Sequence, residues 1–265
     1  MKSLVLANQK GGVGKSAIAC QLAHYYVSKG RRVLFIDLDH QMNSTRALTK
    51  HARVTTAAFS SGAVLAGEDQ PFCPAPFVLV PGDEGLSHLE RQASNHQSYL
   101  NRLHEFVVGQ AANFDLCVID TNPNPDIRYG AAIACSDFIL SPIELNQEAI
   151  DGIRGLLQHG RWGYYKLKGL IKTHELELIG VLPNRVEATP FQRANFKLLV
   201  EEHPQLLIRV DSPKGFLGIP TRTAIAEAQA NSMSLADMPK TSAREAFKDV
   251  KECFDVIARR MALEL

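Results

Sequence analysis

The strongest constraint in this sequence is a run of glycines near its start, QKGGVGKS at residues 9–16. A short apolar segment, residues 2–8, precedes it, and a segment with helical spacing, residues 16–30, follows it. Glycines let a backbone curl so that successive N–H groups point inward, and a helix N-terminus adds a favourable dipole. A strand, a glycine loop and a helix in this order are typical of a phosphate-binding loop, so the sequence predicts a site for a nucleoside triphosphate.

The loop also predicts which groups hold the nucleotide. Lys15 is expected to reach the β- and γ-phosphates, and the Ser16 hydroxyl to ligate Mg²⁺. The alternative is a glycine-rich turn followed by Lys-Ser by chance, which the strand and helix in register disfavour. The residues predicted to surround ATP in this loop are Gly11, Gly12, Val13, Gly14, Lys15, Ser16 and Ala17.

Aspartates stand at the ends of two other apolar runs. Asp120 ends LCVID, and Asp37 and Asp39 lie at the end of VLFIDLD. The carboxyl ends of parallel strands meet in the ligand crevice of such folds. Any one of these residues alone could simply end a strand in a turn. Together they predict a metal site, in which Asp120 holds Mg²⁺ through water.

Short apolar runs alternate with helix-length amphipathic segments along the whole chain. This alternation predicts an α/β fold of the P-loop NTPase type, with a mostly parallel, doubly wound sheet and helices on both faces. Residues 1–265 are expected to form a single domain, and residues 54–75 a loop-bearing excursion within it. The predicted strands are 2–8, 31–39, 76–82, 114–122, 137–145 and 176–184, and the predicted helices 16–30, 96–112, 147–160, 189–203, 222–231 and 241–263.

Charge and cysteine usage limit the remaining possibilities. The net charge is +1, so affinity for a polyanion has to come from a local patch. The five cysteines are scattered without CxxC spacing, which argues against a zinc site or a disulfide framework. We find no signal peptide and no apolar run near the roughly 20 residues of a membrane span. We therefore expect a cytoplasmic protein that does not enter membranes.

A second lysine, Lys10, stands in front of the glycine loop. KGGVGKS with this lysine resembles the deviant Walker A signature of the ParA/MinD family of P-loop ATPases. The resemblance implies that Lys10 crosses a homodimer and contacts the phosphates bound to the partner subunit. A cation supplied in this way stabilises phosphate charge only when two subunits close, so ATP would control dimerisation. The alternative is a solvated lysine on a loop.

Later segments extend the resemblance over most of the chain. VLFIDLDHQMNSTRAL, FDLCVIDTNPNPD, GVLPNR and FLGIPTRTAIAEAQANSMSL are similar to successive segments of that family. The resemblance implies that Asp39 orients the attacking water while Asp37 lies nearer the metal, that Asn184 contacts adenine, and that Pro220 borders the base. The implied catalytic residues are Lys10, Lys15 and Asp39, and the implied metal-binding residues are Ser16, Asp39 and Asp120.

Four residues depart from the family pattern. His40 and Met42 stand where Pro and Gly are usual, and Asn122 and Asn124 interrupt the usual DxPP that begins at Asp120. These positions border the expected water and metal. We therefore expect ATP hydrolysis that is slow and stimulated by a partner.

Basic and aromatic residues gather between residues 152 and 174, where no acidic residue occurs. Such a cluster can grip the phosphate backbone of DNA without reading bases. The alternative is a solvated helix face with Trp162 packed on the core; the resemblance favours nonspecific DNA binding. The candidate DNA-binding residues are Arg154, Arg161, Lys166, Lys168, Arg193 and Arg222.

The resemblance implies a short ParA-type partition ATPase, which partitions a plasmid or chromosome region with a ParB-like or other cargo adaptor protein. It would be associated with the nucleoid. Because the sequence starts at the first strand, operator binding is not expected. A MinD-like membrane-associated ATPase is the main alternative, but acidic residues share its C-terminal apolar helix. An iron–sulfur carrier and a small-molecule kinase are further alternatives, for which the sequence offers neither suitably placed cysteines nor a second substrate site.

Overall fold

The computed structural model describes residues 1–210 and 215–264, and the side chains of 149–151 are not considered. In these residues eight strands form one sheet in the order β3-β4-β2-β5-β1-β6-β7-β8, and each pairing is parallel. The predicted α/β fold with a parallel, doubly wound sheet is confirmed. The strands are Lys2–Leu6 (β1), Val33–Asp37 (β2), Thr55–Thr56 (β3), Phe77–Val80 (β4), Leu116–Asp120 (β5), Phe138–Ile143 (β6), Glu177–Val186 (β7) and Ile219–Pro220 (β8).

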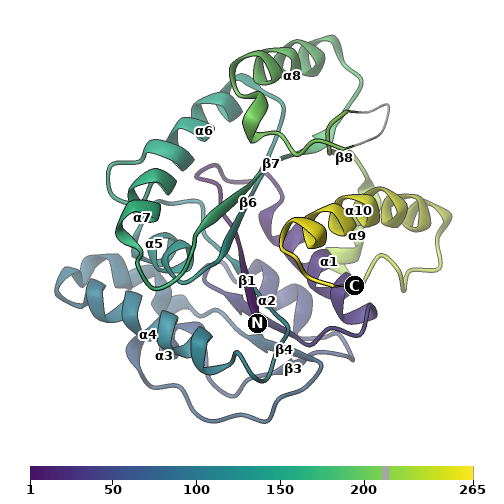
Figure 1. The fold of residues 1–265 in the computed structure, drawn as a ribbon. Helices are drawn as coiled ribbons and strands as arrows, with labels where there is room; N and C mark the ends of the chain where they lie inside the picture. The colour runs from purple at the N-terminus through teal and green to yellow at the C-terminus, as the bar shows by residue number, and fades with distance from the viewer. Residues whose placement is uncertain (211–214, 265) are drawn as a thin grey trace.

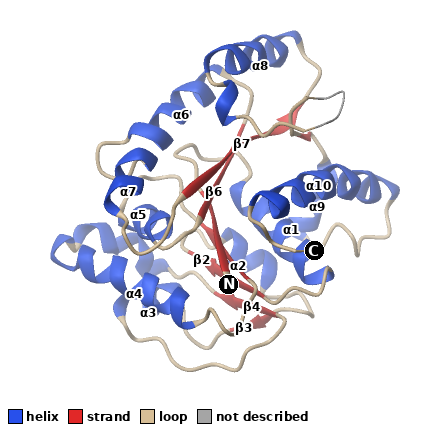
Figure 2. Cartoon of the chain, viewed as in Figure 1, coloured by secondary structure: helices blue, strands red, loops and turns tan. Residues whose placement is uncertain are grey.

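Helices cover both faces of this sheet (Figure 1). The helices that pack on one face of the sheet are Lys15–Ser28 (α1), Asn43–Leu48 (α2), Thr223–Ala230 (α9) and Thr241–Arg260 (α10), whose buried side chains share one hydrophobic core. The other carries Ser61–Ala66 (α3), His96–Gly109 (α4), Ile127–Ala134 (α5), Gln147–Gln158 (α6), Tyr164–Leu170 (α7) and Pro190–Glu202 (α8). Figure 2 shows the strands as a twisted layer between the two groups of helices.

The central strands are apolar because both of their faces are buried. Every residue of β2 and of β5 is buried. In β2, Leu34 and Ile36 pack into one core and Val33 and Phe35 into the other, since successive side chains of a strand point to opposite faces. This double burial explains why the strands appear in the sequence as continuous apolar runs.

The strand order brings three loops to the same edge of the sheet. β1 lies between β5 and β6, and β2 lies on the other side of β5. Leu6 pairs with Asp120, and Asp120 pairs with Asp37, so the ends of β1, β5 and β2 are level. The loops that follow these strands therefore meet at the carboxyl edge, where ligands bind in open parallel sheets.

The structure adds short elements that the sequence pattern did not predict. The excursion at residues 54–75 contains β3 and α3, and the helices α5 and α7 lie in segments for which no helix was expected. The C-terminal helix packs as predicted: Val250, Phe254, Ile257 and Met261 are buried against the sheet. Its apolar stripe is thus part of the core. Within the part of the chain described, no helix is long and apolar enough to span a bilayer.

Candidate nucleotide-binding site

The glycine loop has the backbone conformation that a phosphate site requires. Gly12 and Gly14 have φ angles of 80° and 92°, in the left-handed region that favours glycine. Gly14 is also the N-cap of α1 and, as a glycine, has no side chain that could accept a hydrogen bond from the first turn of that helix. The first N–H groups of α1 are therefore available to an anion.

Side chains from distant segments hold the loop in place. The Asn184 amide Nδ2 donates to the carbonyl of Val13 at 2.8 Å. A Cβ added to Gly14 would lie 2.3 Å from that same Nδ2, so only glycine fits here. Asn184, which the family resemblance implies contacts adenine, thus lies against the phosphate loop itself.

Lys15 lies inside this site and is almost completely buried. Its Nζ donates to the carbonyl of Lys10 at 3.1 Å. Burial lowers the pKa of Lys15, and the nearby carboxylates of Asp120 and Asp39 act in the opposite direction. A buried ammonium that lacks a carboxylate in direct contact is well placed for the negative charge of phosphate.

Asp37 and Asp120 lie side by side at the ends of β2 and β5 and are fully buried. Burial and the proximity of Asp120 raise the pKa of Asp37. Burial also raises the pKa of Asp120, opposed by the hydroxyls of Ser16 and Ser44 and by the charge of Lys15. The Ser44 hydroxyl donates to Asp120 Oδ2 at 2.7 Å, whereas Asp120 Oδ1 is buried and has no hydrogen-bond partner in the described residues.

That orphaned carboxylate oxygen fits a cation site. Two buried carboxylates repel one another unless a cation or a proton intervenes. A hydroxyl and carboxylate oxygens are the ligands that Mg²⁺ prefers. Ser16 and Asp120 are therefore suited to hold Mg²⁺ together, and Asp39, in the next turn, lies near them.

Asp39 begins a tight turn, residues 39–42, that follows β2. Its backbone N–H donates to Asp37 Oδ1 at 3.0 Å, and its own Oδ1 accepts from the backbone of Gln41 at 3.0 Å. Met42 closes the turn by donating to the carbonyl of Asp39 at 2.8 Å. We call residues 39–42 the Asp39 turn.

Met42 adopts a left-handed conformation, with a φ angle of 53°. This conformation strains a residue with a side chain, by about 1 kcal/mol or more. We expect Met42→Gly to raise the free energy of unfolding by up to about 1 kcal/mol, and Met42→Val to lower it, because a β-branched residue fits this region worst. Urea denaturation of the three proteins checks this order; a less stable glycine variant would contradict it.

A cleft of about 920 Å³ joins the glycine loop to the Asp39 turn. Asp120 lies beneath its surface, fully buried. Pro220 lies outside this cleft and lines a separate pocket of about 360 Å³ with Phe196 and Phe216. The residues around the main cleft include Gly11, Gly12, Gly14, Lys15, Ser16, Ala17, Asp39, Gln41, Thr121, Pro123 and Arg185.

Lys10 makes its contacts on the other side of the loop, with the segment that leads into α6. Its Nζ lies 2.6 Å from Glu148 Oε2 and 3.1 Å from Asn146 Oδ1. The ion pair with Lys10 lowers the pKa of Glu148. The glutamate is exposed, so this is a surface ion pair that can open.

The basic residues predicted to bind DNA lie on several elements. Arg154, Lys166, Lys168 and Arg193 are exposed on α6, α7 and α8. Arg161 pairs with Glu90 at 2.6 Å and stacks on Trp162 at 4.4 Å, and Arg222 pairs with Asp249 at 2.8 Å. Trp162 and Tyr164 are buried, and Tyr165 is exposed. The aromatic part of the predicted patch is thus mostly core.

The cysteines are distributed as predicted. Cys20, Cys117 and Cys135 are buried, and Cys73 is exposed in a loop. No group of three or more metal-binding His, Cys, Asp or Glu side chains occurs in the residues described.

Several residues of the site escaped the sequence pattern. Glu148 was not expected to pair with Lys10, and Arg128, in the first turn of α5, was not expected to reach the Asp39 turn. Each contact joins residues more than 80 positions apart, so local patterns carry no signal for it. Ser44 could have been predicted as a residue of the site, because it is one of the hydroxyl residues that closely follow the aspartates at positions 37 and 39.

Comparison with known proteins gives consistent matches. The AAA domain family matches residues 1–162. Protein IncC of Escherichia coli is 30% identical over 271 residues, which cover 99% of this chain and 71% of that protein. The chromosome-partitioning ATPase Soj of Thermus thermophilus is 30% identical over 157 residues, 59% of this chain and 60% of that protein. The solved structure of apo McdA from Cyanothece has the same fold, with a TM-score of 0.76 at 23% identity over 95% of this chain and 98% of that one.

Proposed function

This chain belongs to the ParA/MinD family of P-loop ATPases, and on that basis we propose that it is a partition ATPase whose ATP-bound homodimer binds DNA nonspecifically. The observation that carries the proposal is the position of two lysines on one loop. Lys15 is buried in the cleft, and Lys10 is partly exposed, in an ion pair with Glu148 that can open. One lysine can thus act within the subunit and the other across a dimer.

Hydrolysis in this proposal rests on positioning and charge stabilisation. Ser16 and Asp120 hold Mg²⁺, which neutralises phosphate charge when it is bound. The loop amides and Lys15 hold the β- and γ-phosphates, and Asp39 orients the attacking water. Asn184 borders the adenine base, whereas Pro220, which the resemblance also implies at the base, lies outside the main cleft. The reaction is slow without a stimulating partner.

Dimerisation follows from the placement of Lys10. In the single subunit its ammonium group is neutralised by Glu148. In the dimer Lys10 leaves Glu148 and contacts the phosphates bound to the second subunit. This contact is stronger than the ion pair, because the phosphates carry more negative charge and are excluded from water. ATP thereby favours the dimer, and loss of the γ-phosphate favours its dissociation.

DNA binding is assigned to the exposed cations of α6, α7 and α8, with Arg161 and Arg222 at the margins. Each subunit offers a weak site, and two linked weak sites bind much more tightly than one. A ParB-like or other cargo adaptor protein stimulates hydrolysis and releases the dimer from DNA. The cycle takes place in the cytoplasm, on the nucleoid.

DNA binding tests the proposal directly. We expect the protein to bind duplex DNA with ATP but not with ADP or without nucleotide. If each subunit places about three cations on phosphates, the slope of log affinity against log salt is roughly −5 for the dimer. Lys166→Ala should reduce this slope by about 2, whereas Lys248→Ala, on the exposed side of α10, should not change it. Fluorescence anisotropy at several salt concentrations measures the slopes; binding that ignores nucleotide or salt would contradict the proposal.

A further inference from the structure

A buried arginine lies next to the Asp39 turn and has no part in the nucleotide site as described so far. Arg128, in the first turn of α5, is only 3% exposed. It is not among the residues that line the cleft. Its guanidinium forms a close ion pair with Asp126, with NH2 2.5 Å from Oδ2 and Nε 3.2 Å and 3.1 Å from the two carboxylate oxygens.

Asp126 is itself held in place by several other groups. It is the N-cap of α5, where it accepts the backbone N–H of Arg128 at 3.0 Å. It also accepts from the Asn122 amide Nδ2 at 3.0 Å, and Asn122 lies two residues after the end of β5. The carboxylate is thereby fixed to both the helix and the strand, and it fixes the direction of the guanidinium in turn.

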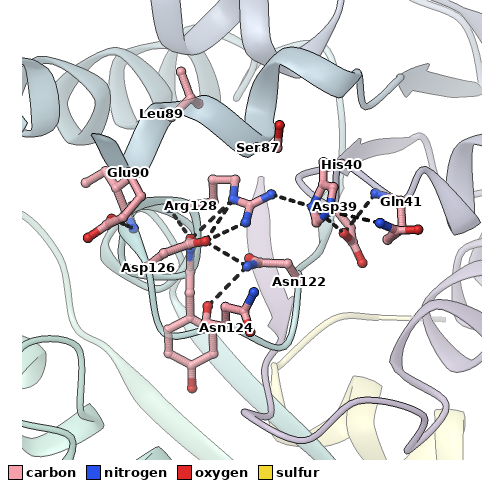
Figure 3. Close-up of polar contacts among 12 residues, drawn as sticks. Asp39, His40, Gln41, Ser87, Leu89, Glu90, Asn122, Asn124, Asp126 and Arg128 are labelled. Atoms are coloured by element: carbon pink, nitrogen blue, oxygen red, sulfur yellow. Dashed lines mark hydrogen bonds and ion pairs between the residues drawn. The ribbon is translucent and has the colours of Figure 1, made fainter. Parts of the chain in front are cut away.

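The remaining arm of the guanidinium reaches His40. Arg128 NH1 lies 2.9 Å from His40 Nδ1, and a guanidinium can only donate, so Nδ1 is the acceptor. Figure 3 shows the Arg128 side chain extending from Asp126 to His40, with Asp39 and Gln41 beyond. His40 Nδ1 is also 3.3 Å from Asp39 Oδ1, and His40 Nε2 is 2.9 Å from the side-chain amide of Gln41. The imidazole thus connects the buried ion pair to the turn.

We propose that Arg128 is a positioning residue for ATP hydrolysis, which fixes the Asp39 turn through His40. Among the described residues, the side chain of Asp39 accepts a hydrogen bond at Oδ1, from the backbone N–H of Gln41. Asp39 lines the cleft, and this hydrogen bond holds its carboxylate in one orientation there. This inference rests on the proposed role of Asp39 in orienting water.

The same arrangement explains why two departures from the family pattern occur together. His40 and Asn122 come from loops after different strands, and both bond to the Arg128–Asp126 pair. A residue without a polar side chain at either position would leave one arm of this network without its partner. The two polar residues thus form one unit with the ion pair.

Steady-state ATP turnover tests this role. We expect His40→Ala and Arg128→Ala each to lower kcat about 10- to 100-fold, because a small misplacement of a positioned group has effects of this size. The dissociation constant for ATP should stay within about twofold of wild type. The double variant should be no slower than either single one, since both act on the same contact. Arg32→Ala, which breaks the arginine–aspartate pair at the opposite ends of β2 and β5, is the control and should keep wild-type turnover.

Hydrogen exchange in the nucleotide-free protein gives a second readout. The amides of Gln41 and Met42 form the hydrogen bonds that close the Asp39 turn. We expect them to exchange about 10-fold faster in His40→Ala and Arg128→Ala, while the β5 amides of Val118 and Ile119 keep their protection. A role in overall stability alone would raise exchange in β5 as well.

The outcomes separate this inference from the proposed function. Wild-type kcat in His40→Ala, or single effects that multiply in the double variant, would overturn it. If Arg128→Ala does not fold, Arg128→Lys keeps a charge for Asp126 but loses the arm to His40, and should then resemble His40→Ala. If wild type turns over ATP but Asp39→Asn is equally active, the proposed role of Asp39 is wrong. In that case, unchanged hydrogen exchange at the Gln41 amide of Arg128→Ala would also show that Arg128 does not fix the Asp39 turn.

Discussion

Lys15→Ala is expected to lower ATP turnover at least about 100-fold, because it removes a buried cation from the cleft. The ammonium group is partly desolvated and faces the carboxylates of Asp120 and Asp39, so its charge is available to phosphate at low dielectric. Alanine leaves the loop amides in place but takes away the charge that balances the β- and γ-phosphates. Phosphate release at saturating ATP measures the effect.

The control for this experiment lies on the same helix. Lys29, at the C-terminal end of α1, is exposed and stacks on Tyr25, far from the loop. Lys29→Ala changes the net charge by the same amount and should leave turnover unchanged. Turnover of Lys15→Ala within about tenfold of wild type would show that the cleft does not hold the phosphates as proposed.

Lys10→Ala is expected to leave ATP binding by the single subunit unchanged but to weaken the ATP-dependent dimer at least about 30-fold, since it removes a charged contact buried between subunits. Light scattering with a non-hydrolysable ATP analogue gives the dimer dissociation constant, and equilibrium dialysis at low protein concentration gives nucleotide affinity. Dimerisation equal to that of wild type would exclude a role for Lys10 across the interface.

Glu148→Gln is the matched variant for that prediction. It removes the partner that Lys10 has to leave, and an exposed ion pair of this kind is only weakly stabilising. We therefore expect the dimer to form a few-fold more readily in Glu148→Gln than in wild type. When Lys10 is already replaced by alanine, Glu148→Gln should bring no such gain, because no ion pair is left to break.

The sequence predicted the parts of the fold that depend on local pattern. The glycine loop, the long strands and the long helices each have a periodicity that burial dictates, and the structure places them as expected. The prediction that Asp37 and Asp120 lie at the same edge of the sheet follows from parallel strands alone, and the register of β2 with β5 places the two residues side by side. Burial of the C-terminal stripe followed from its spacing and its interleaved charges.

The parts that were missed depend on contacts between distant segments. α5 has only eight residues, and the Asn-Pro-Asn-Pro run before it conceals its start, which is marked by Asp126 as N-cap. Arg128 has no local feature that distinguishes it from a surface arginine; only the packing of α5 beside the Asp39 turn buries it. The pairing of Lys10 with Glu148 likewise depends on where α6 begins in space.

The position of β1 in the sheet has a consequence for how the protein is made. β1 and the glycine loop are synthesised before the segments that hold them, because the strand pairs with residues 116–120 and 138–140, and the loop is held by Asn184. Its partners therefore reach it only after more than a hundred further residues have been made, and pairing over such separations is slow. The nucleotide site is thus completed late in synthesis, so a nascent chain binds ATP only once most of the sheet is in place. An interrupted or truncated chain would carry the whole phosphate-loop sequence and still fail to bind nucleotide.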